Sequence, residues 1–220
     1  MAACGQVKRV EEMKKTASIL FLTSNPHKIA EAKTILKPFG VNIIASSGKG
    51  GEIQSDSVEF VARRSAESAY RKIRKPLFVE DSGLYVDALG GFPGAFSAFA
   101  LKTISNEGIL RLLTRVRVRS RPEERKAPGG LRARALDQQR QRSAKFVCAV
   151  AYVDSRGTKV FRGVVKGRIS TRIARGEGFG FDPIFIPAGH SKPFSLMPDV
   201  KMQLSHRAIA LSKLGAYLSR

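Results

Sequence analysis

The first third of the chain alternates between a strand-like apolar run and helix-like stripes of apolar residues. Residues 18–23 form a short apolar run typical of a buried strand, and Asn25 and Pro26 interrupt the pattern that follows it. Asn25 can cap a helix whose first position is Pro26, with apolar residues at helical spacing until Gly40. Residues 41–45 predict another short strand. This stretch therefore predicts a strand-loop-helix-strand unit.

Helical and strand patterns continue to the C-terminus and end in a hairpin and a helix. Residues 154–157 separate two β-branched and aromatic runs with a tight-turn sequence, which predicts a β-hairpin. The predicted elements are a helix over 57–74, a strand from 77, a helix over 106–116, hairpin strands over 145–153 and 158–166, and a helix over 205–218. The order predicts an α/β fold with a mixed central sheet flanked by helices.

Length and composition indicate a single domain. The 220 residues are 43% hydrophobic, enough for one core, so we expect a polar tail over 1–17 and one domain over 18–220. Residues 146–153 are the longest apolar run and fall short of the roughly 18 residues that cross a bilayer, so no membrane association is expected. The charged tail is unlike a secretory signal, which favours a cytoplasmic protein. Cys4 and Cys148 are too few for a disulfide framework or a cysteine zinc site.

The charge of the chain changes the expected partners. Thirty-nine Lys and Arg residues against 18 Asp and Glu give a net charge of +21, so a nucleotide, a nucleic acid and an acidic partner all remain open. Arginines crowd the stretch between Arg115 and Arg142, where apolar residues thin out. We interpret residues 117–141 as an exposed basic insertion in the domain. It can be a nucleic-acid-binding loop, an insertion without function or the product of a misread coding sequence.

The loop between the first predicted strand and helix is a candidate phosphate site. It combines hydroxyl groups, backbone N–H groups at a helix N-terminus and a lysine, all of which bind phosphate. Its residues are Thr23, Ser24, Asn25, Pro26, His27 and Lys28. The loop lacks the glycines of a Walker A motif. A well-capped helix with a surface lysine explains the same residues, and both readings stay open.

Adjacent acids form a second candidate site. Glu80 and Asp81 come at the end of the predicted apolar strand, where carboxylates are avoided unless they contact a metal, a water or a partner. An exposed Asp-Ser-Gly turn is the alternative. Glu52 lies in a Gly-rich loop, and its spacing alone does not mark it as special. A carboxylate pair together with a lysine-bearing phosphate loop fits Mg²⁺-assisted chemistry on a polyphosphate.

Two later motifs can recognise a base. Residues 176–183 alternate glycines with Phe179 and Phe181, so the loop can stack a nucleobase, although core aromatics that anchor a turn give the same pattern. His206 and Arg207 begin the last predicted helix, where a basic pair is disfavoured unless an anion or a carbonyl lies near. A capped helix with surface basic residues is the alternative there.

In this order, the motifs resemble those of the inosine triphosphate pyrophosphatase family. The matching stretches are Thr23–Lys28, Glu80–Leu84 with Ala88–Gly94, Phe179–Pro183 and Ser205–Arg207, within a similarity covering 18–116 and 143–218. The resemblance implies two lobes with the active-site cleft between them, and a homodimer. It also implies an enzyme that hydrolyses ITP, dITP and XTP to the nucleoside monophosphate and pyrophosphate, which keeps deaminated purines out of DNA and RNA.

The resemblance also implies roles for single residues. By this resemblance, Asn25 and Lys28 would contact the phosphates. Glu52 and Asp81 would bind Mg²⁺, and Asp81 would act as the metal-linked base. Further substrate contacts fall to Ser82, to Phe179, Gly180 and Phe181 around the purine, and to Asp182, His206 and Arg207 at its edge, with Arg207 donating to the 6-oxo group. Lys201, four residues before Ser205, matches the lysine that precedes the Ser-His-Arg motif in the family. Arg64 stands where the family commonly has a substrate-binding lysine, and Met202 where it has an asparagine.

A function of a different class remains open beside this one. A triphosphate needs only a handful of cations, so it does not account for a net charge of +21. The alternative is a basic nucleic-acid-binding protein built on an inactive nucleotide-hydrolase fold, which would use the Arg-rich insertion.

Overall fold

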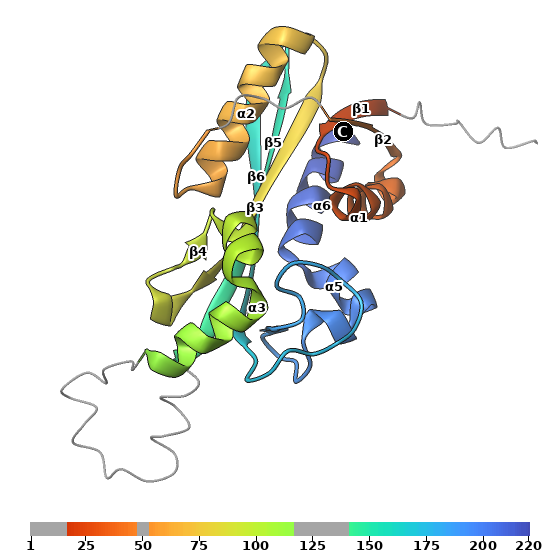
Figure 1. Ribbon diagram of the computed structural model, residues 1–220. Helices are drawn as coiled ribbons and strands as arrows, with labels where there is room; N and C mark the ends of the chain where they lie inside the picture. The colour runs from red at the N-terminus through yellow and green to blue at the C-terminus, as the bar shows by residue number, and fades with distance from the viewer. Residues whose placement is uncertain (1–16, 48–52, 117–140) are drawn as a thin grey trace, which may run out of the picture.

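The computed structural model describes residues 17–47, 53–116 and 141–220. Its centre is a seven-stranded mixed sheet of order β2-β1-β3-β5-β6-β7, with β4 paired to β3 (Figure 1). Strands β2, β1 and β3 are parallel neighbours, whereas β3, β5, β6 and β7 pair antiparallel. The predicted mixed sheet flanked by helices is therefore confirmed.

The elements follow the predicted order. The strands are β1 Ala17–Leu22, β2 Val41–Ser46, β3 Leu77–Val86, β4 Pro93–Gly94, β5 Ser143–Asp154, β6 Gly157–Ile169 and β7 Phe185–Pro187. The α-helices are α1 Pro26–Leu36, α2 Val58–Ile73, α3 Ser97–Arg115, α5 Pro198–Leu204 and α6 His206–Leu218. Short 3-10 helices lie at Lys37–Phe39, Asp87–Leu89 and Phe194–Leu196.

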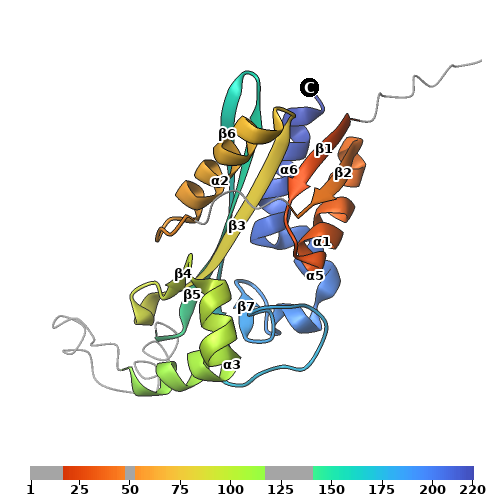
Figure 2. The same ribbon diagram turned by 45° about the horizontal axis from the view of Figure 1, so that its top comes forward.

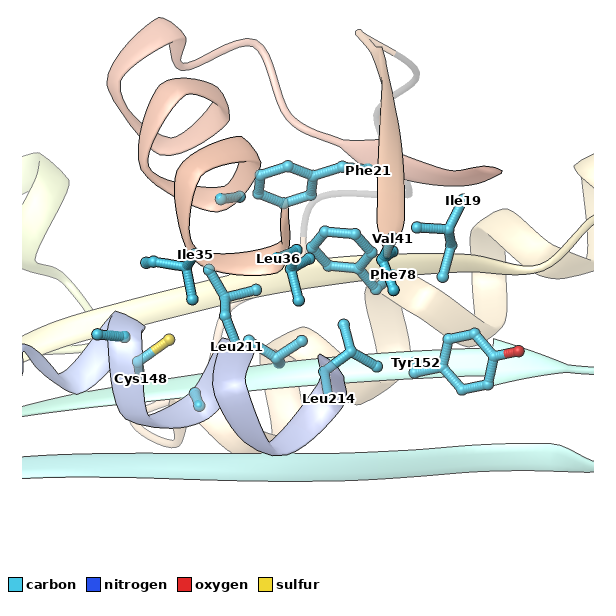
Figure 3. Close-up of a cluster of buried hydrophobic side chains, with 14 residues drawn as sticks. Ile19, Phe21, Ile35, Leu36, Val41, Phe78, Cys148, Tyr152, Leu211 and Leu214 are labelled. Atoms are coloured by element: carbon cyan, nitrogen blue, oxygen red, sulfur yellow. The ribbon is translucent and has the colours of Figure 1, made fainter. Parts of the chain in front are cut away.

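Helices cover both faces of the sheet. On one face, α1 and α6 bury a cluster that includes Phe21, Phe78 and Leu211, where the two phenylalanine rings stack 4.3 Å apart (Figure 3). On the other face, α2 packs alanines such as Ala66 against small residues of β5 such as Ala149. Small side chains on both elements let helix and sheet approach closely, and burial of this apolar surface stabilises the fold.

The long strands β3, β5 and β6 run through both ends of the molecule and join two lobes (Figure 2). One lobe carries β1, β2, α1 and most of α6. At the other end, α3 packs its buried face, including Ile109 and Leu113, against Phe146 and Phe185 of β5 and β7. The candidate site residues lie where the lobes meet.

The structure corrects two of the predicted boundaries. Strand β3 does not end at the acidic pair: it continues to Val86, because β5 pairs with it through the whole stretch from Leu77. Helix α3 spans Ser97–Arg115 and contains a non-helical residue, Ser105, with φ 57°; the part after this kink coincides with the predicted helix over 106–116, and the part before it lies outside that prediction. The predicted polar tail except Ala17, and all of the Arg-rich insertion except Gln141, fall outside the described residues.

Candidate active site

The predicted phosphate loop lies between β1 and α1 as expected, but its groups are arranged differently. The Asn25 side chain caps α1, and its Oδ1 accepts from the N–H groups of His27 and Lys28 at 3.0 and 3.3 Å. Those two N–H groups are therefore not free for a phosphate, which corrects the expectation of a backbone cradle. Of the residues of this loop, Asn25 and Lys28 line the candidate pocket.

Glu80 is the centre of a buried ion-pair network. Its carboxylate lies 3.2 Å from Lys28 Nζ and accepts from Nε and Nη2 of Arg207, each at 3.2 Å. Burial alone would raise the pKa of Glu80, but the charges of Arg207 and Lys28 hold it well below its usual range. Glu80 is therefore ionised at neutral pH and positions two cations at the pocket wall.

Arg207 is fixed from two sides of the molecule. Besides its bonds to Glu80, its Nη1 donates to Glu31 on α1 at 2.7 Å, and its Nη2 donates to Ser82 Oγ at 3.3 Å. These bonds leave one Nη1 hydrogen without an acceptor among the described residues. A buried guanidinium held this rigidly, and lining the pocket, presents a single N–H donor of fixed direction.

His206 faces the same pocket with an unsatisfied atom. Its ring stacks on Phe146 at 4.5 Å, and its Nδ1 has no hydrogen-bond partner among the described residues. Burial, together with the nearby Arg207, lowers the pKa of His206 well below its usual value, so the imidazole is neutral. A buried polar atom without a partner costs free energy.

Two glycines let the site residues reach their positions. A Cβ on Gly163 of β6 would lie 1.9 Å from the carbonyl oxygen of His206, so only glycine allows the start of α6 to rest on the sheet. A Cβ on Gly83 would lie 2.2 Å from the carbonyl oxygen of Gly94. Strand β4, which carries Gly94, therefore packs directly against β3 at Gly83.

The aromatic loop, residues 176–183, contributes one phenylalanine ring that is partly accessible. Phe179 is half-buried and stacks on His27 of the phosphate loop at 4.8 Å, with Lys201 Nζ 4.4 Å from the centre of its ring. Asp182 Oδ2 accepts from the Phe179 N–H and from Lys201 Nζ, at 2.9 and 2.7 Å, and holds the loop. Phe181 is only 4% exposed and packs mainly in the core. The loop thus offers Phe179 as its main stacking surface.

These groups surround one cavity of about 170 Å³. This volume lies below the roughly 300–1,000 Å³ of pockets that enclose a whole drug-sized ligand, so the cavity suits a planar base with phosphates outside it. The predicted site residues that line it are Asn25, Lys28, Asp81, Ser82, Phe179, Gly180, Phe181, Asp182, His206 and Arg207. The cavity brings together residues from both lobes.

Other predicted residues lie apart from the cavity. Arg64 is exposed on α2 and pairs with Glu67 at 3.4 Å, and it does not line the pocket. Thr23, Ser24, Pro26 and His27 belong to the phosphate loop without lining the cavity, although Thr23 Oγ1 accepts from Asn25 N–H at 3.2 Å. Glu52 falls outside the described residues.

Sequence reasoning missed two positioning residues. Glu31 bridges Lys201 Nζ and Arg207 Nη1, at 2.5 and 2.7 Å, and its position three residues after Lys28 places both on one face of α1. An acid beside the otherwise apolar face of α1 is the only sequence signal for it. Asn106 Nδ2 donates to the carbonyl oxygen of Gly180 at 3.1 Å and fixes the aromatic loop to α3. In the sequence, Asn106 is recognisable only as the first residue of a predicted helix, which does not indicate a contact with the aromatic loop.

Asp81 is the carboxylate with no cation of its own. Burial raises the pKa of Asp81 to about 6, against the opposing charge of Lys28 and with the support of Glu80. Within residues 17–47, 53–116 and 141–220, no group of three or more His, Cys, Asp or Glu side chains could hold a metal ion. The described chain therefore offers a single unpaired carboxylate at the pocket.

Comparison with known proteins places the chain in a family. The Ham1 family profile matches residues 19–129 and 129–217, and the chain belongs to this family. The dITP/XTP pyrophosphatase of Ignicoccus hospitalis is 41% identical, covering 91% of this chain and 96% of the relative. That of Saccharolobus solfataricus is 38% identical, covering 94% and 96%. The family resemblance drawn from the motifs is confirmed.

Solved structures agree with the fold. The Staphylococcus aureus Ham1 protein aligns with a TM-score of 0.69 at 29% identity, covering 91% of this chain and 97% of that one. A HAM1 protein from Coxiella burnetii aligns with a TM-score of 0.71 at 25% identity, covering 92% and 98%. None of the described helices is long and apolar enough to cross a bilayer.

Proposed function

We propose that this protein hydrolyses non-canonical purine nucleoside triphosphates, namely ITP, dITP and XTP, to the nucleoside monophosphate and pyrophosphate. Membership of the Ham1 family and relatives that are dITP/XTP pyrophosphatases support this function. The single structural observation that carries it is that Arg207, with one N–H left without an acceptor among the described residues, and His206 line the same cavity as Asn25 and Lys28. The site can remove deaminated purines before they enter DNA or RNA.

Base selection follows from the chemistry of position 6. A 6-oxo group accepts the remaining Arg207 N–H, whereas the 6-amino group of adenine presents a donor and leaves that N–H unpaired. An unpaired buried donor costs on the order of 1–3 kcal/mol, which corresponds to roughly ten- to hundredfold discrimination. The neutral His206 provides a further contact at the base edge, and Phe179 provides the stacking surface.

Asp81 is proposed as the base that orients and deprotonates the attacking water. The oxygen of water bonds to the α-phosphorus, the bond from that phosphorus to the α–β bridging oxygen breaks, and pyrophosphate leaves with that oxygen. The water proton passes to Asp81. A carboxyl pKa of about 6 suits this role, because the group is ionised at neutral pH yet still basic enough to take a proton.

The residues at the pocket fit a Mg²⁺ cofactor. Mg²⁺ is usually held by one or two carboxylates together with substrate phosphates and water, and Asp81 is an unpaired carboxylate beside the predicted phosphate position. Glu52 is proposed as the second ligand. When bound, the ion would neutralise charge on the triphosphate. Lys28 would complement it from the other side of the phosphates.

Product analysis tests the proposed reaction. Incubation with ITP and Mg²⁺, followed by separation of nucleotides and by ³¹P NMR, should give IMP and pyrophosphate in equal amounts. Release of orthophosphate with IDP would contradict attack at the α-phosphorus. Heat-inactivated protein and a reaction with EDTA are the controls, and EDTA should abolish the activity.

Assembly and location belong to the same proposal. We infer a cytoplasmic homodimer, which sedimentation at micromolar concentration should detect as a species of twice the 24.0 kDa chain mass. A species of the chain mass alone would contradict the dimer. The net charge of +21 further supports a nucleic-acid partner, because a triphosphate site uses few of these cations.

A further inference from the structure

A second cavity, of about 780 Å³, shares no lining residue with the candidate active site. It lies at the α3 end of the molecule, where the end of β6 and the following loop meet β7 and residues 191–196 (Figure 2). Its charged lining residues are Arg142, Arg168, Arg172 and Lys192, and we call this surface the basic groove. Among the described residues no carboxylate lines it, so its described lining presents four cations to a ligand.

The cations of the basic groove are oriented but not neutralised. Arg142 Nη1 donates to the carbonyl oxygen of Ser170 at 2.6 Å, and Arg168 Nη1 donates to that of His190 at 3.4 Å. Among the described residues, none of the four cations has a carboxylate within ion-pair distance. Elsewhere in the described chain, arginines commonly have one: Arg156 pairs with Asp154 at 2.7 Å, and Arg162 with Glu59 at 2.5 Å.

Of the four cations of the basic groove, Arg142 is the one whose charged form would be stabilised most by a bound anion. Its side chain is partly buried, and this burial lowers its pKa with no opposing contribution from a nearby acid. A desolvated cation without a counter-charge is costly, and a phosphate in the groove would remove that cost. The hydroxyl groups of Thr171 and Ser191 line the same cavity and can donate to phosphate oxygens as well.

The lining also indicates which phosphate compound fits. Its described lining residues include no aromatic side chain, so they offer no stacking surface for the base of a free nucleotide. Four cations around a cavity of about 780 Å³ instead match the repeating charges of a polymer. Arg142 directly follows the Arg-rich stretch of the sequence, so basic residues continue from the groove along the chain. We propose that the basic groove binds the phosphodiester backbone of nucleic acid, without sequence specificity.

Binding of a fluorescently labelled 20-nucleotide DNA, measured by anisotropy between 50 and 200 mM KCl, tests this proposal. The variant Arg168→Glu/Arg172→Glu removes two groove cations. Arg71→Glu/Lys72→Glu on α2 changes the net charge equally, on exposed residues away from the groove. At 100 mM KCl the groove variant should lose roughly tenfold or more in affinity, and its log–log salt slope should flatten by about 1.4, because each phosphate contact contributes about 0.7.

The α2 variant is the matched control that distinguishes binding in the basic groove from general attraction of DNA to the positively charged protein. The α2 variant should keep its affinity within about threefold, and both variants should hydrolyse ITP at near wild-type rate, which shows that they are folded. Equal weakening of both variants, or no binding by the wild-type chain, would overturn the proposal. Displacement of the DNA by tripolyphosphate at equal phosphate concentration would assign the groove to free polyphosphate instead, and displacement by poly-glutamate would assign it to an acidic protein. Either result would also overturn the proposal.

Discussion

Two adjacent carboxylates on β3 are held in opposite electrostatic surroundings. Glu80 lies between Lys28 and Arg207, which keep it ionised, whereas Asp81 is buried without a cation of its own, and its pKa rises to about 6. Strand alternation explains the difference, because neighbouring side chains point to opposite faces of a sheet. One residue organises the site, and the other remains reactive.

Asp81→Asn is expected to remove activity and raise stability together. The pKa of Asp81 is raised on folding from its ordinary value of 3.8 to about 6, so its charge costs stability, a cost absent only well below its unfolded pKa and complete above the folded pKa. In EDTA at pH 8 the variant should gain about 3 kcal/mol, or several degrees in melting temperature, and roughly a third of that gain at pH 4.5. Its rate of ITP hydrolysis should fall at least about a hundredfold. A variant that keeps a tenth of the activity would refute the role of base.

Glu80→Gln is expected to be strongly destabilising. It leaves Arg207 and Lys28 without their shared buried counter-charge, and breaking such a pair costs about 3 kcal/mol or more. Urea unfolding measures the change. Glu67→Gln is the matched control, because Glu67 pairs with Arg64 at the surface and should lose less than about 1 kcal/mol. Equal losses in the two variants would contradict the importance assigned to the buried network.

At the scale of elements, the start of α6 is positioned by its contact with β6. Gly163 allows this contact, since any larger residue would meet the His206 carbonyl oxygen. Because His206 and Arg207 are the first residues of the helix, a small shift of α6 would move both base contacts. The geometry of one glycine therefore sets the position of His206 and Arg207, the proposed base-reading groups.

Gly163→Ala is expected to lower both stability and base selection. The added methyl must push α6 away from the sheet, and such overpacking typically costs about 1–3 kcal/mol. The preference for ITP over ATP should shrink, with a larger change in KM for ITP than for ATP. Gly157→Ala, at a turn glycine with φ 119°, is a control for loss of stability alone, because backbone strain should destabilise it while its preference for ITP stays unchanged. An unchanged preference in Gly163→Ala would show that α6 is positioned otherwise.

Much of this organisation could be predicted from sequence. Asn25 and Pro26 mark the start of α1, and the turn at 154–157 marks the hairpin, because these signals are local. The extension of β3 beyond Glu80 could not be predicted, because it depends on pairing with β5 and on cations from α1 and α6. The role of Glu31 depends on the same long-range contacts.

At the scale of the whole molecule, the Arg-rich stretch is separable from the catalytic lobes. Helix α3 ends at Arg115, β5 begins at Ser143, and Gln141 Nε2 donates to the carbonyl oxygen of Leu113 at 2.6 Å, so the two sides of the stretch lie close together. A short linker can therefore join them without strain.

Replacement of residues 117–140 by a six-residue Gly-Ser linker is expected to leave ITP hydrolysis within about threefold of wild type. Such a linker reaches across a short gap at small entropic cost. Steady-state kinetics and thermal unfolding measure the outcome. Loss of activity in a folded deletion variant would place the stretch in the active site or in a dimer interface.

The central claim is that Arg207 and His206 select a 6-oxo purine in the pocket. The most direct measurement is kcat/KM for ITP and for ATP with the wild-type protein under identical Mg²⁺ and salt. One contact accounts for ten- to hundredfold discrimination, and two contacts predict a preference for ITP of roughly a hundredfold or more. A ratio near one would contradict the account.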